Sequence, residues 1–160
     1  MTLQSLNSVL WNERQLLELL LFKLEEEQLL LAAGKTRWLS HSTREVENVL
    51  EQIKEVELAR SIESDSAAVE LGLAPETPLS ALVEAAPEPW NELLGSHRTA
   101  FVQLTTEIEA FVSENRELLT TSQRAAQETL LNIQRDASTY DESGATTNGE
   151  AQPRLLDQSL

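Results

Sequence analysis

The chain of 160 residues contains no cysteine, which excludes disulfide bonds and thiolate metal sites. This absence also suits a protein of the cytosol. Glycine and proline are scarce, with five residues of each, and the chain has one tyrosine and three phenylalanines. Leucine, alanine, glutamate, glutamine and serine dominate instead. A chain with few helix breakers and many good helix formers is predicted to be all-α.

Long apolar runs and basic segments are missing as well. No apolar run approaches the roughly 20 residues that cross a bilayer as a helix, so we expect no membrane insertion. The net charge is −15, with acidic groups along the whole chain. Phosphate backbones would be repelled, and we expect no nucleic-acid partner. Such acidity favours solubility and attraction to basic protein surfaces.

The triplet Gly34-Lys35-Thr36 matches the end of a nucleotide-binding P-loop. That loop also needs a glycine five positions before Gly34, where this chain has Leu29, and it must follow a β-strand. No strand pattern precedes the triplet. We therefore interpret Gly34 as the left-handed residue that ends a helix, with Lys35 and Arg37 near the negative helix terminus.

Two long helices are predicted in the first half, at about 3–33 and 36–71. The first carries a wide leucine seam at heptad spacing, which comprises Leu3, Leu6, Leu10, Glu13, Leu17, Leu20, Leu24, Glu27 and Leu31. The second carries a thinner seam that slips by one three-residue step in its middle. Its members are Leu39, Ser42, Val46, Val49, Ile53 and Val56, and after the slip Ala59, Ile62, Ser66, Val69 and Leu73.

A short helix is predicted at about 79–86, with Thr77 as its N-cap and Pro78 at its first position. We expect it to close one end of the bundle. A third long helix is predicted from residue 88 or 89 to about Ala137. Beyond Leu118 its first register turns polar and the apolar line moves by one residue, to Leu119, Ala126, Leu130, Ile133, Ala137 and Tyr140.

The predicted fold is therefore an elongated antiparallel helical bundle, or hairpin, of three long helices and one short helix. Residues 1–140 form the bundle domain in this interpretation. Residues 141–160 are rich in turn formers and polar groups, and we expect a flexible, disordered C-terminal tail.

Candidate catalytic residues are absent from the sequence pattern. The two histidines, His41 and His97, lack the Glu at i−3 that a di-iron bundle requires, and no His-Glu-x-x-His or Gly-x-Ser-x-Gly motif occurs. We expect no enzyme, no cofactor and no metal site. His97 is expected to be a hydrogen-bonded core residue and His41 to be solvated. Asn115 lies on the seam of the last helix, where it either fixes the register or is reached by water.

Six stretches in a characteristic order resemble the FlgN family of flagellar export chaperones. They are LLELLLFKLEEEQ at 16–28, AAGKTRWL at 32–39, TREVE at 43–47, LGL at 71–73, NRELL at 115–119 and YDESG at 140–144. The resemblance implies a cytoplasmic, non-enzymatic chaperone built as a long helical bundle. It implies that the chain binds the hook–filament junction proteins FlgK and FlgL and delivers them to the export gate protein FlhA.

The resemblance also implies site residues. The family's gate-binding tyrosine lies beyond the last long helix and four residues before a glycine, a pattern that Tyr140 and Gly144 match. Substrate contacts of the family fall in the C-terminal helical part, which here presents the turned apolar line with Leu119, Ala126, Leu130 and Ile133. A narrow line of this kind suits reversible cover of a client helix.

Two other interpretations stay open on the sequence. The leucine seam is also typical of a self-assembling coiled-coil structural or adaptor protein with no secretion client, and a homodimer is possible. The ring of Tyr140 could equally continue the line through Ile133 and Ala137 and pack on the bundle.

Overall fold

The computed structural model describes residues 2–142, and for 138–142 it describes the backbone alone. The elements are α1 (Thr2–Ala32), the 3₁₀ turn η1 (Thr36–Trp38), α2 (Leu39–Glu70), α3 (Leu79–Ala85) and α4 (Trp90–Glu142), with no strand in this part of the chain. The predicted all-α class is confirmed. The predicted tail lies, from residue 143 onward, outside the described residues. The chain divides into two compact units, the first Met1–Leu118 and the second beginning at Leu119.

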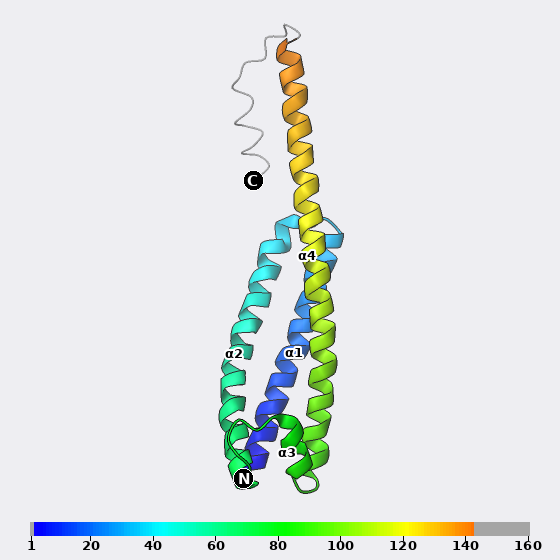
Figure 1. Ribbon diagram of the computed structural model, residues 1–160. Helices are drawn as coiled ribbons and strands as arrows, with labels where there is room; N and C mark the ends of the chain where they lie inside the picture. Colours follow the sequence, from blue (N-terminus) through cyan, green and yellow to red (C-terminus); the bar gives the residue numbers. More distant parts are fainter. Residues whose placement is uncertain (1, 143–160) are drawn as a thin grey trace. The chain divides into compact units, whose positions relative to one another are not determined.

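In the first unit, α1 and α2 form an antiparallel pair (Figure 1). Two ion pairs join them: Arg60 Nη1 lies 3.0 Å from Glu13 Oε1, and Lys23 Nζ lies 2.8 Å from Glu45 Oε2. The partner's number falls along α2 as the residue number rises along α1, which is the register of an antiparallel pair.

The part of α4 that belongs to the first unit runs parallel to α1 (Figure 1). His97 Nε2 lies 3.0 Å from Asn7 Oδ1, and Asn115 Nδ2 donates to the carbonyl oxygen of Leu24 at 2.9 Å. Asn115 is 4% exposed, so it is held by α1 and not by open water. Of its two predicted environments, the structure has the buried, register-fixing one.

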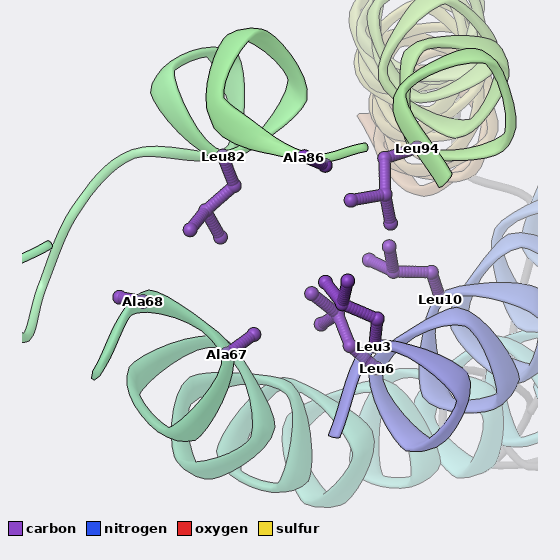
Figure 2. Close-up of a cluster of buried hydrophobic side chains, with 8 residues drawn as sticks. All are labelled: Leu3, Leu6, Leu10, Ala67, Ala68, Leu82, Ala86 and Leu94. Atoms are coloured by element: carbon purple, nitrogen blue, oxygen red, sulfur yellow. The ribbon is translucent and has the colours of Figure 1, made fainter. Parts of the chain in front are cut away.

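A hydrophobic cluster lies where all four helices of the first unit meet (Figure 2). Leu82 of α3 is fully buried in it, which confirms that the short helix closes an end of the bundle. The cluster takes side chains from every helix: Leu3, Leu6 and Leu10 of α1, Ala67 and Ala68 of α2, Leu82 of α3 with Ala86 directly after it, and Leu94 of α4. The predicted leucine seam of α1 therefore packs against all the other helices of the first unit in this core.

A second buried cluster lies farther along α1, toward the turn that joins it to α2. Leu20 and Leu24 of α1 meet Val46, Val49 and Ile53 of α2 there. Ile108 and Phe111 of α4 pack against this cluster from the third side. The seam thus contacts two partner helices along its length, as its width predicts.

Glycines end both α1 and α2 in the same way. Gly34 has φ 68° and Gly72 has φ 74°, a conformation that costs other residues a steric penalty. Beyond α1, the N–H of Lys35 donates to Leu30 at 2.9 Å and that of Gly34 to Leu31 at 3.2 Å. This is the Schellman arrangement, which satisfies the last carbonyls of a helix. Gly34 is confirmed as a helix stop.

The start of α3 differs from the prediction. Pro78, with ψ 153°, occupies the N-cap position and no side chain caps the helix. The hydroxyl of Thr77 donates instead to the carbonyl oxygen of Ala74. The side chain of Thr77 therefore stabilises the turn before α3 and does not cap the helix.

The predicted slip in the seam of α2 is wrong. Ile62 and Val69, which were expected to be buried after the slip, are 60% and 62% exposed. The original register continues unbroken to Ala67, which is fully buried. This register includes Arg60 and Glu63, and because both are charged, the sequence pattern does not reveal them as seam positions. Arg60 is accommodated there because it pairs with the seam residue Glu13 of α1.

Glu13 is a carboxylate inside the leucine seam, only 3% exposed. Burial raises the pKa of this carboxyl, the Arg60 guanidinium opposes that rise, and Glu57 adds to it. The net direction is upward, so removal from water outweighs the attraction of the ion pair. In the ionised form Glu13 costs the fold stability.

We expect Glu13→Gln to be more stable than the natural chain near neutral pH, because burial disfavours the ionised carboxylate of Glu13. Glutamine keeps an acceptor for Arg60 and cannot ionise. A carboxyl whose pKa is raised on folding contributes stability below its unfolded pKa and loses it as pH rises through the folded pKa. The advantage should therefore appear above the ordinary carboxyl pKa of 4.5 and grow as the pH rises, as measured by urea unfolding. Glu25→Gln, at an exposed position of α1, is the control. A Glu13→Gln chain less stable than the natural one at the higher pH would contradict this account.

Candidate protein-binding surface

An exposed apolar row runs along α4 in the second unit. Leu119, Leu130 and Ile133 are 38%, 37% and 44% exposed, and Ala126 is also exposed. Their spacing of seven, four and three residues places them on one face of the helix. The four predicted substrate-binding residues therefore share a face that, within this unit, is open to solvent. We call this set the α4 strip.

The same helix buries a different line in the first unit. Leu94 is fully buried, His97 is 1% exposed and Asn115 is 4% exposed. Counting onward at the same spacing leads from Asn115 to Ser122, which is polar, whereas the apolar line continues from Leu119. At about 100° per residue, however, Ile133 falls at the same angle as Asn115, and Leu119, Ala126 and Leu130 fall within about 60° of it. The predicted turn of the apolar line is therefore a change of heptad register and not a change of helix face.

The borders of the α4 strip are polar but mostly uncharged. Arg124 and Glu128 stand two residues before and after Ala126, about 200° around the helix and hence on the opposite side. Between 119 and 135 they and Arg135 are the charged residues, although the whole chain carries 27 acidic groups. The near flanks of the strip are formed by Ser122, Gln123, Gln127 and Thr129. A partner on this face would meet little electrostatic field.

Leu131 adds apolar surface that the periodic line does not include. It is 54% exposed, more than Leu130 beside it in the sequence. The sequence feature that could have indicated this surface is the Leu130-Leu131 pair, because two adjacent leucines cannot both lie on one narrow helix line. With Leu131 the exposed apolar surface is broader than the strip alone.

Tyr140 lies inside α4, which ends at Glu142 and not near Ala137 as the periodicity predicts. Its backbone is helical, and it follows Ile133 by seven residues, on the same helix face. Its side chain and Gly144 lie outside the described residues.

The two histidines have no ligand-like setting. His97 contacts the ring of Trp11 edge-on, with centroids 4.8 Å apart, and its Nε2 meets Asn7. Burial lowers the pKa of His97, and the Arg14 guanidinium lowers it further, so the ring is neutral. This confirms the predicted hydrogen-bonded core histidine. His41 is exposed beside Trp38, as expected.

Other kinds of site leave no trace in the described part of the chain. Among those residues, no three histidine, cysteine or carboxylate side chains gather closely enough to hold a metal ion. None of the described helices combines the length and the apolar character needed to cross a membrane. The arrangement that the structure does offer is an exposed apolar helix face.

Comparison with known proteins supplies the family. No curated protein and no solved structure matched the chain. A family model described as FlgN protein matches residues 1–148, which is most of the 160-residue chain. Such a match agrees with the all-α fold and with the resemblance noted in the sequence, and it indicates clients among the flagellar hook-associated proteins. The chain belongs to the FlgN family of flagellar export chaperones.

Proposed function

We propose that this protein is a cytoplasmic chaperone that binds the hook–filament junction proteins FlgK and FlgL and delivers them to the export gate protein FlhA. The observation that carries the proposal is the exposed α4 strip. A secretion client in transit has unpaired helical ends with apolar rows, and an apolar helix face can cover such a row.

The α4 strip offers a modest binding free energy, which suits a client that must later be released. Its large side chains are partly covered already, so burying the remainder contributes on the order of 1 kcal/mol for each. Ala126 and the polar residues between the leucines keep the contact narrow. Association must also offset the entropy of bringing two molecules together, so these side chains alone do not give tight binding.

The leucine seam supports this division of roles. Leu6 and Leu10 are fully buried, and Leu20 and Leu24 are each 4% exposed, within a single chain. That seam motivated the alternative of a self-assembling coiled coil. Because α2 and α4 of the same chain cover it, its width gives no reason to invoke a second copy or a scaffold.

Delivery is assigned to Tyr140. Its position four residues before Gly144 matches one part of the family's gate-binding pattern, although Tyr140 lies within α4 and not beyond the last long helix. It follows the α4 strip by two helical turns along the same face. In this proposal the strip holds the client while the aromatic ring contacts the gate. Aromatic side chains are common anchors of binding energy at protein interfaces.

Changing Leu130 and Ile133 together to serine is expected to weaken binding of FlgK or FlgL by at least about tenfold. The fold should persist, because exposed positions contribute little to stability. Isothermal titration with purified client measures the affinity, and circular dichroism checks the helix content. Unchanged client affinity in a folded double variant would remove the strip from the account.

A matched control uses the buried line of the same helix. Leu94→Ala should lower the free energy of unfolding by about 2–5 kcal/mol, because it opens a cavity in the core. Measured well below its unfolding temperature, that variant should still bind the client. The control separates loss of the surface from loss of the fold.

Tyr140→Ala is expected to keep client affinity and to weaken binding of the client-loaded chaperone to the cytoplasmic part of FlhA. Tyr140→Phe, which retains the ring, should bind more tightly than the alanine variant. Equal gate affinity of the alanine variant and the natural chain would show that Tyr140 does not contact the gate.

A further inference from the structure

The exposed side of α2 carries a second row that the bundle does not use. Leu58, Ile62 and Val69 are 67%, 60% and 62% exposed. They lie at intervals of four and seven residues and so share one face of the helix. The first unit buries Ala67 and Ala68 on the other side. We call Leu58, Ile62 and Val69 the α2 row.

Carboxylates occupy the remaining places on the same line. Glu51, Glu55 and Asp65 continue the spacing of the row, since 51, 55, 58, 62, 65 and 69 follow steps of four and three residues. Lys54 is next to Glu55 in the sequence. The helix face that contains the α2 row therefore combines bulky apolar side chains with a net negative charge, unlike the nearly neutral α4 strip.

A hollow of about 330 Å³ borders the row where α2 faces the loop before α3. Asp65 and Glu76 line it together with Ser61, Ser64 and Thr77. Asp65 Oδ1 accepts the backbone N–H of Glu76 at 2.7 Å, which holds the loop against the helix. Arg60 also lines the hollow, but its Nη1 is engaged by Glu13. The hollow thus offers carboxylates to a long basic side chain.

We propose that the α2 row and this hollow form a second docking surface, which takes an amphipathic helix whose apolar residues are flanked by lysine or arginine. The apolar residues would cover Leu58, Ile62 and Val69, and a basic side chain would enter the hollow beside Asp65 and Glu76. Charge complementarity selects this occupant. A second copy, from a chain of net charge −15, would bring further carboxylates against these ones.

Two exposed aromatic residues of α1 already have cationic neighbours. The Arg14 guanidinium lies 4.9 Å from the ring centroid of Trp11, and Lys23 Nζ lies 5.6 Å from that of Phe22. Cations of the same helix already lie on these aromatic faces. The α2 row differs from Phe22 and Leu29 in bordering the acidic hollow, which neither of those two residues lines. Phe22 and Leu29 then serve as control positions.

The probe is a labelled synthetic helix of about 18 residues with leucines at i, i+4, i+7 and i+11 and lysines on both flanks. Fluorescence anisotropy measures its affinity for the full chain. Ile62→Ser with Val69→Ser should weaken binding about tenfold, and Asp65→Asn with Glu76→Gln about threefold. Added salt should weaken binding to the natural chain and have less effect on the Asp65→Asn, Glu76→Gln variant. Phe22→Ser with Leu29→Ser should bind as the natural chain does.

Three results would overturn the proposal. The Ile62→Ser, Val69→Ser variant could keep full affinity, or a peptide of the same composition in permuted order could bind equally well. Sedimentation could also show self-association that these two substitutions abolish, which would make the row an interface between copies. Binding of FlgK or FlgL should be unaffected by the α2 variants, so failure here and failure of the α4 strip are separate outcomes.

Discussion

The structure depends on one helix face, the leucine seam of α1, which is buried by two neighbours at once. Leu6 and Leu10 are fully buried where α2, α3 and α4 converge, and Leu20 and Leu24 are buried farther along by α2 and α4. Apolar burial is the dominant favourable term in folding. Because this seam supplies most of the apolar contacts of the core, the smaller apolar rows elsewhere remain on the surface, where they can bind partners.

Polar groups within this core set how the helices are aligned. Glu13 meets Arg60, His97 meets Asn7, and Asn115 meets the carbonyl of Leu24. Sliding one helix by a turn would leave these buried groups without partners, at a cost of about 1–3 kcal/mol for each neutral group and more for a charge. A bare leucine seam, with near-identical heptads, would tolerate such shifts more easily. The buried polar contacts thus help to give the repetitive sequence one register.

Local signals in the sequence predicted most of the elements. The leucine periodicity, the glycines at 34 and 72 and the prolines around 78 to 89 act within a few residues, and the bounds of α1, α2 and α3 agree closely with the prediction. The register of the second half of α2 could not be predicted in this way. It depends on Arg60 being neutralised by Glu13, which is 47 positions earlier in the chain and on another helix. The apolar side chains of Ile62 and Val69 led to the wrong prediction that these two residues are buried.

The candidate surface shows the same limit. Periodicity identified Leu119, Leu130 and Ile133 as members of one apolar line, but only coordinates show that they are exposed in the second unit. Leu131 escaped detection because a strict line admits one of two adjacent leucines. The end of α4 was placed too early because Tyr140 is the one apolar residue among 138–142, although nothing in this segment breaks a helix.

Hydrogen–deuterium exchange of the full chain, free and saturated with FlgK or FlgL, tests the central claim most directly. The claim is that the α1 seam is consumed inside the molecule while the α4 strip is kept for a client. The account predicts slower amide exchange across 119–137 on binding, with the exchange of 3–31 unchanged. Slower exchange confined to α1 and α2, with none in 119–137, would contradict it.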